Sequence, residues 1–233
     1  MKKFFTKQSL PVLALVFFLS LVPAFWGCEQ EEGEPAHMGY GYFPDTRGHW
    51  VIYEVDSIVY DDFTGEVDTF YYQVKEVIES VFIDAEGKES LRLERFIRQD
   101  FEDDWNIKNV WKARVLPSRA EKTEENITYI KLVFPVRLNA HWDGNAYNYL
   151  EEQQYRITDL HQNYQAGELT FDSTVTVLQK DFETLISEDF QKEIYAKGVG
   201  MVFKKFVELN KEVDGTIVSG VNYSYSVLDY GKE

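Results

Sequence analysis

The residues of this chain that could do chemistry are few and widely spaced. Its four histidines show neither the His-x-His nor the His-Glu-x-x-His spacing of zinc sites, and no Gly-x-Ser-x-Gly elbow marks a nucleophile. Adjacent carboxylates could hydrolyse a glycoside if two pairs met across a cleft, but all of them fall in expected turns, where charge is ordinarily solvated. The pairs are Asp61/Asp62, Asp103/Asp104, Glu124/Glu125 and Glu151/Glu152. We therefore expect no catalytic residue, metal site or cofactor, and a hydrolase remains an alternative.

Cys28 is the single cysteine of the chain, and it follows a segment with the layout of an export signal. Three lysines lie within the first seven residues, and residues 10–26 carry no charge. An uncleaved membrane-spanning helix is the alternative, because such a span needs about 20 apolar residues. Two prolines oppose it, since each removes a backbone donor from the helix. We expect residues 1–27 to be a cleaved signal peptide.

The residues Ala24-Phe25-Trp26-Gly27-Cys28 resemble a bacterial lipobox, in which a small residue precedes the cysteine that becomes acylated. The resemblance implies cleavage between Gly27 and Cys28 and lipidation of Cys28. Phe25 and Trp26 stand where lipoboxes usually carry an aliphatic and a small residue. Because each buried methylene contributes ~0.8 kcal/mol, two or three acyl chains would hold the protein on a membrane permanently. A thioether would also remove the oxidation liability of a lone thiol in an exported chain.

An acidic stretch follows the cysteine, with Glu29, Glu31 and Glu32 ahead of a proline. Its composition predicts a flexible tether over residues 28–40. The stretch also resembles the surface-export signal of lipoproteins from Bacteroidota-type bacteria. That resemblance implies lipid anchoring in the outer membrane with exposure at the cell surface, and the periplasmic face is the alternative.

The net negative charge limits the kinds of partner that the chain can bind. The chain of 233 residues has a net charge of −16, and without the three lysines of residues 1–27 the remaining 21 basic and 40 acidic residues give −19. Such a chain would be repelled by nucleic acid and by an anionic bilayer surface. We therefore expect contact with the membrane only through the N-terminal lipid. The acidity suits a solvated surface, a cationic ligand or calcium, although no loop has EF-hand spacing.

Residues 41–233 alternate apolar and polar side chains with period two, which predicts a single β-rich domain. The turns that interrupt the pattern indicate about nine to eleven strands in a curved antiparallel meander. Such a sheet buries its apolar face as a barrel, a half-barrel or two packed layers. Phe182–Ile194 lacks strict alternation and is the one segment that could form a short helix. The expected class is all-β.

The segment Tyr195-Ala196-Lys197-Gly198-Val199-Gly200 resembles a closing segment of uncharacterised Bacteroidota surface lipoproteins. Phe43-Pro44 and Gly48-His49-Trp50 resemble their opening segment. The resemblance implies a β-rich single domain and brings no established activity. The two glycines leave one strand face bare, which permits a bulge or close approach by another chain segment.

A non-catalytic binding or accessory role fits this chain best. The candidate ligand loop contains Trp142, Asp143, Asn145 and Tyr147, because rings and polar groups in one turn could bind a glycan or a protein. A carrier of lipid or another apolar ligand, built on an open half-barrel, is the alternative. Ser57 and Ser173 lie in three-residue motifs that resemble the O-glycosylation motif of exported Bacteroidota proteins.

The Cys28→Ala variant tests the anchor. Without the thiol no acyl chain can be attached, so we expect the protein to leave the membrane fraction after cell lysis, as measured by fractionation and immunoblotting. A variant that stays membrane-bound at its mature mass would contradict the interpretation.

Overall fold

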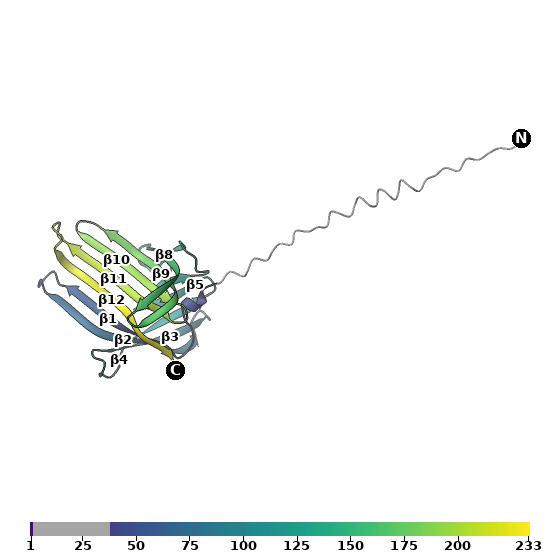
Figure 1. Ribbon diagram of the computed structural model, residues 1–233, viewed down its shortest axis with the longest axis horizontal. Coiled ribbons are helices and arrows are strands. Elements are labelled where there is room, and N and C mark those ends of the chain that lie inside the picture. Colours follow the sequence, from purple (N-terminus) through teal and green to yellow (C-terminus); the bar gives the residue numbers. More distant parts are fainter. Residues whose placement is uncertain (2–37) are drawn as a thin grey trace. The chain divides into compact units, whose positions relative to one another are not determined.

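The computed structural model describes Met1 and residues 38–233. The signal, Cys28 and the acidic stretch with Glu29, Glu31 and Glu32 lie outside the described residues. Twelve antiparallel strands make up one sheet (Figure 1). They are β1 (His49–Tyr60), β2 (Val67–Ile83), β3 (Glu89–Arg98), β4 (Asn106–Leu116), β5 (Arg119–Glu124), β6 (Ile127–Val133), β7 (His141–Asp143), β8 (Gln154–Ala166), β9 (Leu169–Glu183), β10 (Ser187–Ala196), β11 (Gly200–Lys211) and β12 (Ile217–Lys232).

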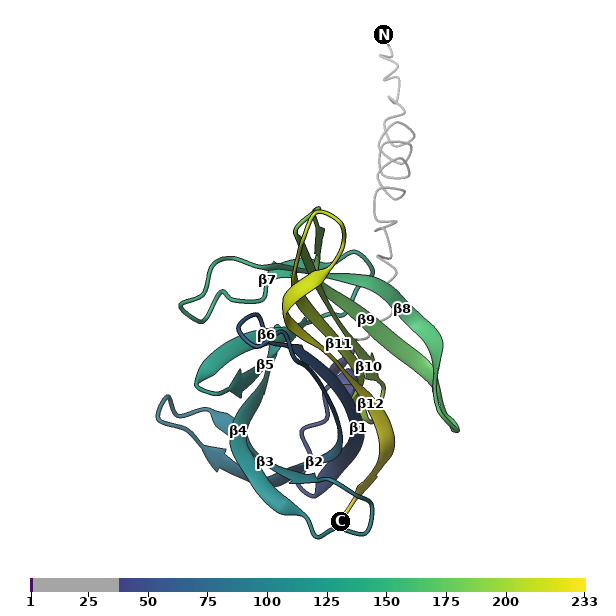
Figure 2. The same cartoon turned by 90° about the vertical axis from the view of Figure 1, so that its left-hand side faces the viewer.

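The strand order is β6-β5-β4-β3-β2-β1-β12-β11-β10-β9-β8-β7, so the first and last strands of the chain pair in the middle of the sheet. The sheet curls into a nearly closed barrel (Figure 2). Its two edges meet where the Ile130 amide donates to the Gly144 carbonyl at 2.9 Å and the Trp142 indole donates to the Ile130 carbonyl at 2.9 Å. The all-β prediction is confirmed, with a strand count slightly above the expected nine to eleven.

The expected short helix at Phe182–Ile194 is wrong. Those residues form the end of β9, a tight hairpin and most of β10. β10 pairs with β9 on one side and β11 on the other, so its backbone hydrogen bonds are satisfied in the sheet despite its irregular side-chain pattern. β5 and β7, with six and three residues, were too short for alternation to reveal them.

Within the described residues the one helical segment is a 3-10 turn, Tyr40–Tyr42. No described helix is long and apolar enough to cross a bilayer. Residues 38–40 were expected in the tether, but the Met38 carbonyl accepts a hydrogen bond from the Val136 amide at 3.0 Å, and Met38 packs on the core. The domain therefore begins earlier than predicted.

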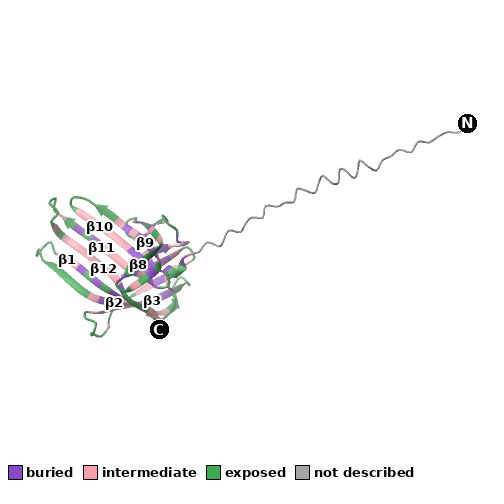
Figure 3. Ribbon diagram, viewed as in Figure 1, coloured by how far each residue is buried: buried purple, intermediate pink, exposed green. Residues whose placement is uncertain are grey.

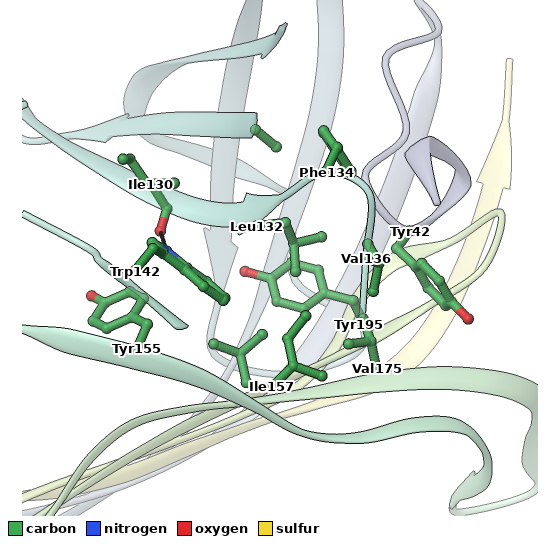
Figure 4. Close-up of a cluster of buried hydrophobic side chains, with 12 residues drawn as sticks. Tyr42, Ile130, Leu132, Phe134, Val136, Trp142, Tyr155, Ile157, Val175 and Tyr195 are labelled. Atoms are coloured by element: carbon green, nitrogen blue, oxygen red, sulfur yellow. Dashed lines mark hydrogen bonds between the residues drawn. The ribbon is translucent and has the colours of Figure 1, made fainter. Parts of the chain in front are cut away.

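The buried residues lie away from the hairpin tips (Figure 3). The cluster at the seam between β6 and β7 includes Leu132, Trp142, Tyr155, Ile157 and Tyr195 (Figure 4). A hydrocarbon cluster here supports closure, because β6 and β7 do not form a regular hydrogen-bonded ladder with each other and packing helps to hold the two edges together.

The segment around the 3-10 turn packs against the turn between β10 and β11. The Gly198 amide in the β10–β11 turn donates to the Gly41 carbonyl at 2.7 Å. A Cβ at Gly200 would lie 3.1 Å from Pro44, and the residue has φ +94°, a backbone conformation that favours glycine. The close approach of another segment, expected from these two glycines, is confirmed.

The Trp142→Phe variant tests the closure of the seam. The ring stays apolar, but the buried Ile130 carbonyl loses its indole donor, so we expect the free energy of unfolding to fall by about 1–3 kcal/mol. Urea unfolding measures this loss. Tyr149→Phe, at an exposed ring, is the control and should change stability by less than about 0.5 kcal/mol. Equal midpoints for the two variants would contradict the role of Trp142.

Candidate functional site

A cavity of about 530 Å³ lies inside the barrel, lined by strands β1–β6 and β10–β12 and by the segment after the 3-10 turn. We refer to this cavity as the lumen. Its apolar part is formed by Phe43, Val51, Ile78, Leu91, Leu93 and Met201. Its polar part contains the charged residues Glu76, Arg95, Lys122, Glu124, Lys131, Glu193 and Lys204. The volume lies within the ~300–1,000 Å³ of small-molecule pockets.

Strand alternation places the two kinds of residue in the same cavity. In β3, Leu91, Leu93 and Arg95 are spaced by two and all line the lumen. The register pairs Leu93 with Ile78 and Arg95 with Glu76. The charged pair is therefore one step along the strands from the apolar pair, and the lumen is amphipathic.

Glu76 lies between two cations. Its carboxylate accepts hydrogen bonds from Lys122 Nζ at 2.7 and 2.8 Å, and Arg95 Nε lies 3.3 Å from Glu76 Oε2. The Arg95 guanidinium stacks on the Trp111 ring at 3.6 Å from its centroid, an arrangement that stabilises a desolvated cation. Arg95 and Lys122 are buried, and their shared partner carries one negative charge.

A second cluster joins the two halves of the chain. Lys131 Nζ in β6 lies 2.9 Å from Glu124 and 3.1 Å from Glu193 in β10. Lys204 Nζ lies 3.7 Å from Glu193, whose other oxygen accepts a hydrogen bond from the Tyr195 hydroxyl. Two cations and two anions thus compensate each other in the lumen wall.

The electrostatics of this second cluster keep all four groups charged. Burial alone would raise the pKa of Glu124 and Glu193, but Lys131 and Lys204 outweigh it and hold both carboxyl pKa values below their ordinary range. Burial opposes the charge on Lys131 and Lys204 as well, yet the facing carboxylates, Glu124 foremost, raise the pKa of both lysines. None of these shifts moves a group toward neutrality, where a general acid or base would be tuned.

The structure separates the members of the predicted ligand loop. Trp142 lies in β7 with 8% of its surface exposed, so it is a packing residue of the seam and cannot serve as a surface platform. Asn145 is also buried, and its side chain donates to the Glu151 carbonyl at 2.7 Å. Asp143 accepts the amides of Asn145 and Gln153. Only Tyr147 is open to solvent, with Arg119 over its ring at 4.3 Å.

The two predicted glycosylation serines are also placed by the fold. Ser57 lies in β1 and is 8% exposed, so a glycan cannot be accommodated there in the folded chain. The Ser173 hydroxyl is engaged, 2.8 Å from the Tyr42 hydroxyl and 3.2 Å from His161 Nδ1.

The lumen charges were missed at the sequence level, although a signal was present. Glu76 shares the alternation phase of Val74 and Ile78, and Arg95 shares that of Leu91 and Leu93. A charge in the phase of buried residues costs free energy unless it is paired, so it marks either a polar lumen or a break in the strand. Which cations would meet which carboxylates depends on the pairing of distant strands.

Comparisons with known proteins do not identify a family. No family model matches the chain, and no curated protein matches it. Among solved structures, the crystal structure of "a putative lipoprotein from Parabacteroides distasonis" matches with 12% sequence identity and a TM-score of 0.37. The match covers 82% of this chain and 98% of that chain.

The Glu193→Gln variant tests the second cluster. Removing one partner of a buried ion pair should lower the free energy of unfolding at pH 7 by about 3–5 kcal/mol. The pKa of Glu193 lies below its ordinary value of 4.5 in the folded chain, so its contribution is complete above pH 4.5 and is lost as the pH falls further. The variant should therefore lose less stability than the wild type on acidification below that pH.

Chemical unfolding monitored between neutral and acidic pH measures both effects. Glu208→Gln, at an exposed position of β11, is the control and should follow the wild type. Parallel pH profiles of stability for Glu193→Gln and the wild type would contradict the role of the neighbouring lysines in lowering the pKa of Glu193.

Proposed function

We propose that this chain is a lipid-anchored envelope protein that binds a small amphipathic molecule in the lumen of its barrel. The observation that carries the proposal is the lumen itself, a cavity of about 530 Å³ with an apolar part beside a charged part. An apolar cavity with a few convergent polar groups is the usual form of a small-molecule site. Barrels with wide lumens hold ligands in this way.

The lipid anchor in this proposal is supported by the sequence. The lipobox-like residues ending at Cys28 and the acidic stretch after it support lipidation and outer-surface exposure. A protein held at a membrane is well placed to take up or release molecules that partition into lipid. The proposed role is thus binding or carriage of a ligand at the envelope. It combines the hypothesis of a binding or accessory protein with that of a carrier of an apolar ligand.

The charge states in the lumen favour binding over hydrolysis. A glycosidase needs one carboxylic acid whose pKa is raised so that it can donate a proton. Glu124 and Glu193 have their pKa lowered, and Lys131 and Lys204 have theirs raised. Groups held in their charged forms are suited to fixing the orientation of a ligand.

Filling the lumen tests the proposal. Membranes that carry the full-length protein are incubated with a ten-carbon alkyl probe bearing a diazirine and are then irradiated. The labelled peptides are mapped by mass spectrometry. We expect adducts on the lumen-facing peptides of β2, β3 and β4. Ala113→Phe adds a ring inside the cavity and should reduce this labelling several-fold.

Val110→Phe is the matched control, because Val110 lies on the same strand with 41% of its surface exposed and faces away from the lumen. It should label like the wild type. Absence of adducts from the lumen peptides, or labelling that Ala113→Phe leaves unchanged, would refute the proposed function.

A further inference from the structure

We propose that the ligand carries one anionic head group, such as a carboxylate, which binds at Arg95 and Lys122 while its apolar tail lies against Ile78, Leu91 and Leu93. The inference rests on the proposed function and names the class of molecule that the lumen selects. A monoanionic amphiphile of the fatty-acid type has this chemistry.

The charges of the lumen wall do not cancel. Glu124 and Glu193 are balanced by Lys131 and Lys204, as described above. Among the described residues, Glu76 is the one carboxylate that forms ion pairs with Arg95 and Lys122. At the rim, Glu125 and Lys108 also line the cavity and add one charge of each sign. One positive charge is therefore left over, in a chain whose net charge is −16.

One donor of Arg95 has no hydrogen-bond partner among the described residues. Its Nη1 donates to Asn109 Oδ1 at 3.2 Å, but its Nε is fully buried and makes no hydrogen bond, because the nearby Glu76 oxygen is poorly aligned. The residue is 5% exposed and lines the lumen. An unsatisfied buried donor on a guanidinium is unfavourable, and an oxyanion is the partner that this planar group binds best.

The head site, formed by Arg95 and Lys122, lies beside the apolar surface of the lumen. Glu76 and Arg95 are neighbours across β2 and β3, and the next inward pair along the same strands is Ile78 and Leu93. Inward residues repeat every ~6.4–6.8 Å along a strand, so a tail that leaves the head site reaches apolar surface at its first carbons. Leu91 and Phe43 continue this surface.

A single negative charge also separates ligand classes. A carboxylate matches the excess of one positive charge, whereas a phosphate monoester with nearly two charges would leave a buried negative charge uncompensated. A neutral alcohol of the same length would gain the tail contacts without satisfying Arg95. The expected order of preference is therefore carboxylate, then alcohol.

The test compares two diazirine probes of equal length, a decanoic acid and a decanol, with the full-length protein in its membranes at pH 8, where a free carboxyl is ionised. The measured quantity is the ratio of acid to alcohol labelling on the lumen peptides of β2–β4. We expect the wild type to favour the acid, and Arg95→Gln to lower the ratio about tenfold. Arg92→Gln, on the outer face of the same strand, is the matched control and should leave the ratio unchanged.

Glu76→Gln supplies the opposite change. It removes the carboxylate that competes for Arg95 and Lys122, so the acid-to-alcohol ratio should rise above that of the wild type. Because a folding defect would lower alcohol labelling as well, retained alcohol adducts show that the lumen is intact in each variant.

Equal labelling by acid and alcohol, or an Arg95→Gln variant with the wild-type ratio, would overturn this inference and leave the proposed function standing. Absence of both probes from the lumen peptides of the wild type would overturn the proposed function and this inference with it.

Discussion

The pairing of β1 with β12 is the constraint on which the rest of the structure depends. It joins the halves β1–β6 and β7–β12 into one sheet, so that the two short edge strands can meet at the seam. The lumen exists only because of this pairing. Glu124 and Lys131 come from the first half, and Glu193 and Lys204 come from the second. Their mutual compensation therefore couples the closure of the barrel to the electrostatics of its interior.

A wide barrel cannot be filled by hydrocarbon side chains alone, and this chain lines part of its interior with charge. Buried ions are tolerated when each has a partner, because removing one partner leaves a desolvated charge. The four groups around Lys131 satisfy this condition. The group around Glu76 does not, since two cations share one carboxylate and Arg95 retains an unsatisfied donor. A ligand can therefore contribute most at Arg95 and Lys122, where the protein's own carboxylates do not fully compensate the positive charge.

The sequence predicted the fold class well and the site poorly, for physical reasons. Alternation in His49–Tyr60 reflects one face with buried Val51, Tyr53 and Val55 and an opposite face that is more exposed, a local property that needs no knowledge of partners. Trp142 was misjudged because a tryptophan beside a turn has the same local sequence pattern whether it lies on an exposed surface or is buried in a seam. The carbonyl that accepts its indole hydrogen bond belongs to Ile130 on β6, which stands at the opposite end of the strand order from β7, so the contact depends on closure of the barrel. Arg95 and Glu76 were in the buried phase, but the lumen they line depends on long-range closure.

The opposite charges of surface and lumen bear on how a ligand would arrive. The acidic exterior repels anions in solution, but screening confines that repulsion to about 8 Å at physiological ionic strength. An amphiphile dissolved in a bilayer bypasses most of it, because its approach is driven by apolar contact. Anchoring by Cys28 would place the lumen beside such a reservoir. The acidic surface would then disfavour free small anions that lack a tail, and the lumen would select by tail first and head group second.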